Sequence, residues 1–145
     1  MRPHAWYRQV APALLILAAS CAPTGLQQVT LRISSPYTPG RYEDHTVKPR
    51  ERFPIMDTEY EGQLGEFIAD FAIDTTRMKA MSFSDTLRNP AVRVRIFRGD
   101  SLVDSAWAFP VGQFRHISRT TQLIFEIADF VAGRPYVPWV EPTGK

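Results

Sequence analysis

Residues 91–109 constrain the fold more than any other stretch, because polar and apolar side chains alternate there in two runs. In the first run, aliphatic residues take every second position: Val92, Val94 and Ile96. Gly99 and Asp100 then mark a turn. In the second run, one face carries Val103, Ser105, Trp107 and Phe109. Two alternating runs around a Gly-Asp pair predict a β-hairpin.

Other stretches carry the same signal. Alternation over 29–33 predicts a half-buried strand, and 60–74 and 121–131 are further extended segments. Residues 53–56 are a short strand that Pro54 places at a sheet edge. Twelve prolines exclude a long helical bundle. The sequence therefore predicts an all-β fold, an antiparallel β-sandwich or partly open barrel of about six strands.

Two long stretches read as loops. Residues 35–52 contain three prolines and many charges, with room for one short extended piece, and 75–89 is mostly polar. Within the second loop we expect Met78, Met81 and Phe83 to pack against the core. Residues 134–145 form a proline-rich tail that we expect to be irregular.

The first twenty residues have the layout of a secretory signal. Arg2 and Arg8 give a positive start, an apolar run over 10–19 follows, and small residues lead to Cys21. The run is about half of the roughly 20 residues that a membrane-spanning helix needs. We therefore expect 1–20 to be a signal peptide, with an N-terminal signal helix.

The sequence Leu17-Ala18-Ala19-Ser20-Cys21 resembles a bacterial lipobox. This resemblance implies cleavage before Cys21, multiple acylation of the cysteine, and a body tethered on the extracytoplasmic side of the cell envelope. Residues 21–25 would then be the lipidated cysteine and a short linker. The alternatives to a lipoprotein signal are an uncleaved membrane anchor and a plain secretory signal in which the cysteine occurs by chance.

Charge argues against nucleic-acid binding. The whole chain carries 17 basic and 15 acidic residues, but removing Arg2 and Arg8 with the signal leaves equal numbers. A balanced chain without basic clusters lacks the usual means of neutralising phosphates along a nucleic acid. Cys21 is the only cysteine, so its acylation would leave no thiol for a disulfide, nucleophile or metal.

We find no group of residues in the sequence with the pattern of a catalytic site, and we therefore expect no enzyme activity and no metal site. After signal removal, His45 and His116 remain far apart in loop-like surroundings, and His116 is a weak candidate for binding a cofactor. Trp107 and Phe109 are either core aromatics or an exposed strip that docks a partner. Tyr136 and Trp139 are partner-binding candidates because proline-rich chain rarely enters a core.

Three motifs in order resemble one family. They are EFIADFAID at 66–74, NPAVRV at 89–94, and the Trp107-to-Pro110 segment followed by His116. Together they resemble the extracytoplasmic domain of ResB-like cytochrome c biogenesis proteins, over roughly residues 60–131. The resemblance implies a β domain at 26–133 that takes part in delivering haem to apocytochrome c. The haem-handling histidines of the family's membrane helices have no counterpart here, so none is carried over.

Two functions follow as hypotheses. The first is a lipid-anchored accessory of c-type cytochrome maturation that meets assembly proteins, with apocytochrome or transient haem as further partners. The second is an envelope lipoprotein of β-sandwich type that binds an unrelated ligand or partner. The order of the motifs favours the first, whereas the second needs only the signal and the fold.

Overall fold

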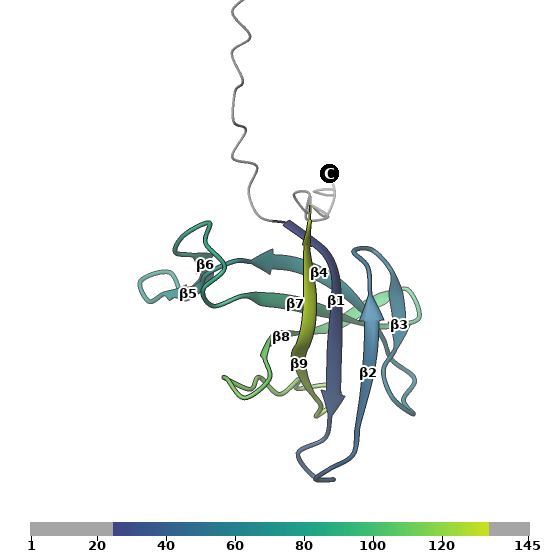
Figure 1. The fold of residues 1–145 in the computed structure, drawn as a ribbon. Helices are drawn as coiled ribbons and strands as arrows, with labels where there is room; N and C mark the ends of the chain where they lie inside the picture. Colours follow the sequence, from purple (N-terminus) through teal and green to yellow (C-terminus); the bar gives the residue numbers. More distant parts are fainter. Residues whose placement is uncertain (1–24, 134–145) are drawn as a thin grey trace, which may run out of the picture.

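A computed structural model describes residues 25–133, and every regular element in that range is a strand (Figure 1). The nine strands are β1 (Gly25–Ser34), β2 (Tyr42–Val47), β3 (Arg52–Pro54), β4 (Glu61–Ile68), β5 (Phe71–Asp74), β6 (Lys79–Ser82), β7 (Ala91–Arg98), β8 (Ser101–Pro110) and β9 (Ile124–Gly133). Residues 25–133 contain no helix long and apolar enough to cross a membrane. The all-β prediction is therefore confirmed for this range.

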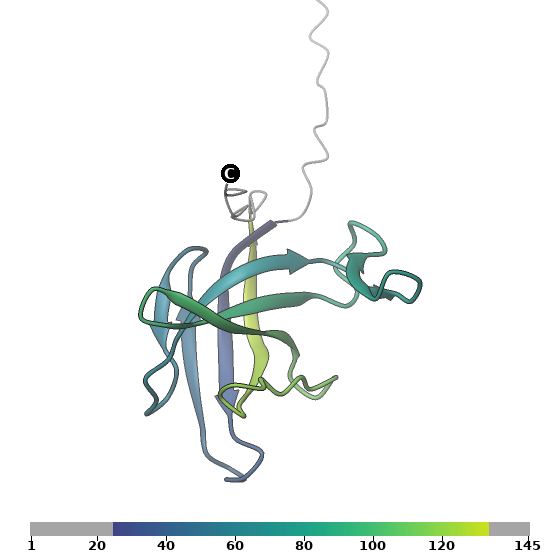
Figure 2. The same cartoon turned by 180° about the vertical axis from the view of Figure 1, so that it is seen from behind.

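Seven strands form one nearly closed sheet in the order β2-β1-β9-β8-β7-β4-β3. Its strands lie in two layers, in which β2, β1 and β9 cross β4 and β7 (Figures 1 and 2). The layers join where β8 pairs with β9 in parallel at Phe109 and Pro110. At the other edge, the rings of His45 and Phe53 lie 5.7 Å apart, so β2 and β3 also meet through side chains.

The core lies between the two layers. Alternate residues of β1 point inward, as do those of β7, because successive side chains of a strand face opposite sides. The largest fully buried side chain is Phe125 of β9. The predicted hairpin is confirmed as β7 and β8, and Gly99 takes the positive φ of +58° that its turn requires.

The sheet differs from the sequence prediction in three ways. It is mixed rather than purely antiparallel, and the described residues hold nine strands rather than about six. One extra strand, β6, lies in a stretch predicted to be a loop, and β2 is a short extended piece of the kind for which the predicted loop 35–52 left room. The extended segment 60–74 is broken into β4 and β5, because the chain bends at Ala69 before Asp70 bridges to Asn89.

The prediction that Met78, Met81 and Phe83 pack against the core is wrong. β5 and β6 form a separate two-stranded sheet that projects from one side of the molecule (Figures 1 and 2). Met78 is 79% exposed and Phe83 is 75% exposed. We call residues 71–83 the β5–β6 arm.

Several predicted features lie outside the described residues. These are the signal helix over 1–20, the lipidation site Cys21, and the tail 134–145 with Tyr136 and Trp139. Within the described range, the predicted linker ends where β1 begins, at Gly25. Gly25 pairs with Gly133, so both ends of the described chain lie at one end of the molecule (Figure 1).

Candidate functional site

The outer face of the β3-β4-β7 layer carries a row of polar side chains. Register places Arg52 of β3 beside Gln63 of β4, and Gln63 beside Arg95 of β7. Neighbouring strands lie about 4.8 Å apart, so the three side chains emerge close together. Residues more than forty positions apart in the sequence therefore share one patch of surface.

Phe97 holds two of these arginines in place. The guanidinium carbon of Arg52 lies 4.0 Å from the centre of the Phe97 ring, and that of Arg95 lies 5.2 Å from it. Such cation–π contacts position a guanidinium against an aromatic face. Arg52 also donates one hydrogen bond to the Gly99 carbonyl at 2.6 Å and one to the Glu61 carboxylate at 3.2 Å.

A glycine makes room for Arg95. A Cβ at Gly65 would lie 3.2 Å from Cγ of Arg95 and 3.2 Å from the carbonyl oxygen of Arg93. Without that Cβ, the aliphatic stem of Arg95 lies close over the neighbouring strand. The small residue at position 65 thus helps to set where this cation sits.

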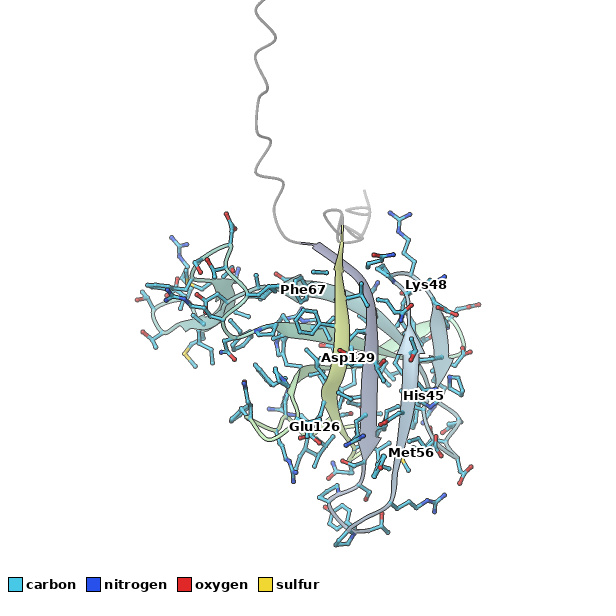
Figure 3. All side chains as sticks on the ribbon, in the orientation of Figure 1. His45, Lys48, Met56, Phe67, Glu126 and Asp129 are labelled. Atoms are coloured by element: carbon cyan, nitrogen blue, oxygen red, sulfur yellow. The ribbon has the colours of Figure 1, made fainter. Side chains whose placement is uncertain are left out.

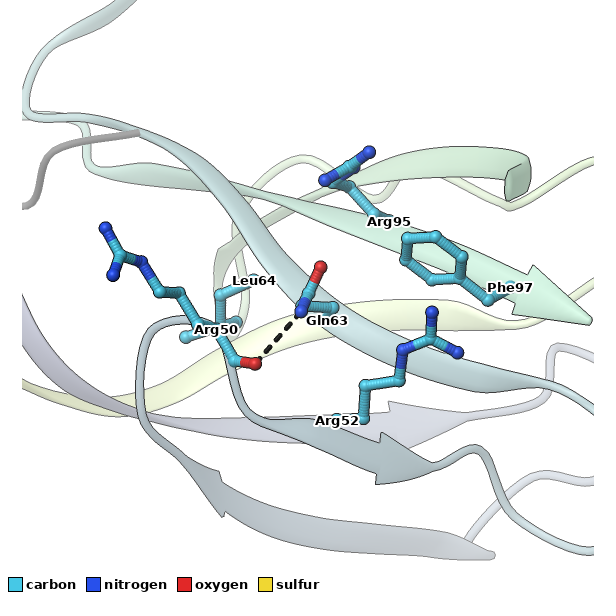
Figure 4. A pocket seen from close by; sticks show the side chains of 6 residues that line it. All are labelled: Arg50, Arg52, Gln63, Leu64, Arg95 and Phe97. Carbon is cyan, nitrogen blue, oxygen red and sulfur yellow. Dashed lines mark hydrogen bonds between the residues drawn. The ribbon is translucent and has the colours of Figure 1, made fainter. Parts of the chain in front are cut away.

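These residues line a cavity of about 370 Å³ (Figure 4). We call it the arginine groove, and it is formed by Arg50, Arg52, Gln63, Leu64, Arg95 and Phe97. Gln63 lies at its centre and donates a hydrogen bond to the Arg50 carbonyl at 2.9 Å. The lining contains three guanidinium groups and no carboxylate, so the groove is suited to anions.

A second feature is an aromatic cluster at the base of the arm. We define it as Phe71, Trp107, Phe109 and Phe114. The ring of Phe71 meets Trp107 at 5.1 Å and Phe109 at 4.9 Å, both edge to face. Phe109 in turn meets Phe114 at 5.5 Å. Edge-to-face contacts stabilise aromatic pairs beyond the burial of their area.

The members of this cluster differ in exposure. Phe114 is 69% exposed, Trp107 is half-buried, and Phe109 is only 4% exposed. The structure thus brings the two predicted docking residues, Trp107 and Phe109, into one cluster, with Phe109 behind the others. The sequence analysis did not identify Phe114, which lies in a loop without periodicity.

His116 lies against the same cluster. Its ring is half-buried, and its Nδ1 accepts a hydrogen bond from the backbone N–H of Trp107 at 2.9 Å. The remaining ring nitrogen, Nε2, is the atom through which His116 would bind a cofactor. Its proposed role as a cofactor ligand stays a prediction. In residues 25–133, no three His, Cys, Asp or Glu side chains are grouped to hold a metal ion.

Hydrogen bonds fix the base of the β5–β6 arm to the body. The backbone N–H of Phe71 donates to the Asn89 carbonyl at 2.8 Å, and that of Phe83 donates to the Asp70 carbonyl at 2.8 Å. The Ser84 hydroxyl donates to the Asp70 carboxylate at 2.7 Å. The arm therefore projects from a well-defined base.

Beyond that base, apolar side chains of the arm and the loop after it face solvent. They are Ile73, Met78, Met81, Phe83 and Leu87. A cavity of about 480 Å³ lies between the arm and the sheet, and Trp107 and Met78 are among the residues that line it. Arg93 stacks over Trp107 at 4.8 Å along the same wall. The cavity and the Phe71–Trp107 contact thus join the arm to the aromatic cluster, and the cavity lining includes the charged residues Glu66, Lys79 and Arg93.

No family model, curated protein or solved structure matches this chain.

Proposed function

We propose that this chain is a lipid-anchored, non-enzymatic accessory of c-type cytochrome maturation, held on the extracytoplasmic side of the membrane. It binds an assembly protein, apocytochrome or haem through the surface formed by the aromatic cluster and the β5–β6 arm. The observation that carries the proposal is the exposure of large apolar side chains on a projecting hairpin whose Phe71 packs on Trp107. The ordered motifs that resemble ResB-like proteins supply the process.

Exposed apolar surface supports a binding role. Single exposed apolar residues are ordinary on soluble proteins, whereas a contiguous group marks an interaction site. Aromatic residues and methionine are enriched at the centres of such interfaces. Methionine also adapts to irregular partners because its side chain is unbranched and flexible. Met78, Met81 and Phe83 give the arm this composition.

The lipid anchor would place this surface near a membrane. Cys21 precedes Gly25 by four residues, so even a fully extended chain spans only about 14 Å between them. An acylated Cys21 would hold the body next to the bilayer, where membrane-bound assembly proteins work. Haem would be a cargo passed between proteins, with Arg93, which stacks on Trp107, offering a cation for its carboxylates.

Crosslinking from the proposed surface tests the partner. A photoreactive phenylalanine analogue is placed at Phe114 in the full chain, and the same analogue is placed at Tyr37 as the control. Tyr37 is 74% exposed in the turn between β1 and β2, and its hydroxyl donates to Gln122 at 3.5 Å, so it samples the other end of the loop that carries Phe114 rather than the arm. We expect position 114, and not 37, to capture a cytochrome c assembly protein or apocytochrome from membranes. Capture of neither at 114 contradicts the proposal.

One observation favours the alternative, an envelope lipoprotein that binds an unrelated ligand. The arginine groove lies on the β3-β4-β7 face and does not include any member of the aromatic cluster. A chain whose main role is to bind a small anionic ligand would use this groove. Normal cytochrome c levels after gene deletion, together with ligand binding in the groove, would favour the alternative.

A further inference from the structure

We propose that the arginine groove binds the phosphate group of an anionic ligand. This inference does not depend on a role in cytochrome maturation, because it rests on a different face of the sheet. It starts from local charge. Although the chain without its first twenty residues is balanced overall, positive charge concentrates here.

The charges around the groove leave an excess of two cations. Lys48, Arg50, Arg52 and Arg95 are the basic residues of this region, and Glu51 and Glu61 are the acidic ones. Glu61 pairs with Arg52 at 3.2 Å. The Glu51 carboxylate accepts a hydrogen bond from the backbone N–H of Lys48 at 3.1 Å, which closes the turn before β3. Glu51 thus has its partner outside the groove's lining, whereas Glu61 offsets the charge of Arg52, which is a lining residue.

Two of the three lining arginines, Arg52 and Arg95, are positioned before any ligand arrives. Phe97 supports the guanidinium groups of Arg52 and Arg95, and the Gly99 carbonyl fixes Arg52 further. Figure 4 shows Arg50 on the opposite side of Gln63 from Arg52 and Arg95. Donors held in advance lose less conformational freedom on binding, which favours affinity.

This arrangement fits phosphate better than carboxylate. One arginine fork satisfies both oxygens of a carboxylate, whereas a phosphate group offers more oxygens and up to two negative charges. Guanidinium groups on two sides of a groove can therefore bind linked phosphate groups, one at each side. The Gln63 amide at the centre adds a polar group to the same floor.

Two sources could supply this phosphate. One is a soluble phosphorylated compound, and the other is the headgroup of an anionic phospholipid. The position of Lys48 supports the second source, because Lys48, in the turn that leads to Arg50, lies near the end of the molecule where β1 begins (Figures 1 and 3). That end follows Cys21 in the chain.

Calorimetric titration tests phosphate binding, which both sources have in common. The full chain in a nonionic detergent is titrated with inorganic pyrophosphate. We expect saturable binding that weakens as salt is added, because exposed charges are screened. We expect Arg50→Ala and Arg95→Ala each to weaken binding by about tenfold, since each removes a hydrogen-bonded charge. Arg41→Ala is the matched control, because it removes an equal charge that pairs with Asp57 outside the groove.

Each outcome of the titrations either supports the phosphate site or overturns it. Absence of pyrophosphate binding, or an equal loss in Arg41→Ala, overturns the proposal. Because Arg95→Ala alters a side chain packed on Phe97, its unfolding curve is recorded, and the exposed Arg50→Ala gives the second, independent reading. Arg95→Lys keeps the charge but loses the fork, so we expect it to recover only part of the affinity.

A short-chain, soluble phosphatidylglycerol distinguishes the two sources. If it binds, competes with pyrophosphate and weakens with Arg50→Ala, the ligand is a lipid headgroup. If only pyrophosphate binds, the ligand is a soluble phosphate compound. Each result supports the phosphate site and assigns its source. Short-chain phosphatidylcholine is the control lipid, because its headgroup carries no net charge.

Discussion

The backbone N–H of Trp107 donates a hydrogen bond to Nδ1 of His116 at 2.9 Å. β8 pairs with β9 only at Phe109 and Pro110, so at Trp107 the neighbouring strand has already diverged. The imidazole therefore takes the place of a strand partner and ties the loop after β8 to the aromatic cluster. A backbone donor that would otherwise lack a sheet partner is satisfied by a side chain.

Replacing His116 tests the structural part of this relationship. His116→Ala leaves the Trp107 N–H without its acceptor, and we expect a loss of about 1–2 kcal/mol in the free energy of unfolding. His116→Asn offers an amide oxygen as a substitute acceptor, so its loss should be smaller. Urea denaturation measures both. Equal stability of His116→Ala and wild type would show that the bond contributes nothing.

The carboxyl group of Asp104 should make the free energy of unfolding depend on pH. Burial raises the pKa of its carboxyl, but hydrogen bonds from the Thr120 backbone, the Ser118 hydroxyl and the Ser105 backbone outweigh burial and lower it. Because the folded pKa lies below the unfolded value of 3.8, the stabilisation is present above that value. It is lost as the pH falls through the folded pKa.

Asp104→Asn should therefore lower stability at pH 7 by about 1–3 kcal/mol and flatten the loss of stability below about pH 4. Asp100→Asn, at an exposed turn position, is the control and should keep the wild-type acid limb. Denaturation curves recorded from pH 7 to pH 2.5 give the comparison. Identical acid limbs for Asp104→Asn and wild type would contradict this role.

Substitutions of exposed residues in the β5–β6 arm should affect partner binding with little effect on the stability of the fold. Met78→Ser and Phe83→Ser alter exposed side chains, so we expect changes of no more than about 0.5 kcal/mol in unfolding free energy. The same variants should reduce the crosslinking yield from position 114. Phe71→Ala removes a ring that packs on Trp107 and Phe109 and should cost about 1–3 kcal/mol. Undiminished crosslinking in both serine variants would exclude the arm from the interface.

Acylation predicts a specific mass. The chain isolated from membranes should begin at Cys21 and carry added acyl mass, and Cys21→Ser should retain residues 1–20 without acyl groups. Intact-mass spectrometry reads both. A wild-type chain that begins elsewhere, or an unmodified Cys21, would remove the anchor from the proposed function while leaving the groove and the arm to be tested separately.

The strands that face the core were predictable from the sequence, and the polar strands were not. β1, β7 and β8 show alternation because one face of each is buried. In β2, only Val47 is buried, so no apolar face marks the strand. β6 has no buried residue, and it forms because it pairs locally with β5. Hydrophobic periodicity arises because one face of a strand is buried, so it does not reveal a strand that is exposed on both faces.

The candidate sites were predictable only in part. Trp107, Phe109 and His116 were singled out by residue type and motif, and the structure brings them together. The arginine groove depends on the register that aligns Arg52, Gln63 and Arg95 across three strands, and a sequence does not show register. The alternation of Arg93, Arg95 and Phe97 was the one signal that could have indicated it. Phe83 was expected in the core because apolar type alone does not reveal exposure.

The most direct test of the proposed function measures covalent haem in cytochromes c. The gene is deleted, and the strain is complemented with wild type or with a Trp107→Ala, Phe114→Ala variant whose folding is checked by its unfolding curve. We expect haem-stained cytochrome c to fall on deletion, to recover with wild type, and to stay low with the folded variant. Unchanged cytochrome c in the deletion strain would contradict a role in maturation.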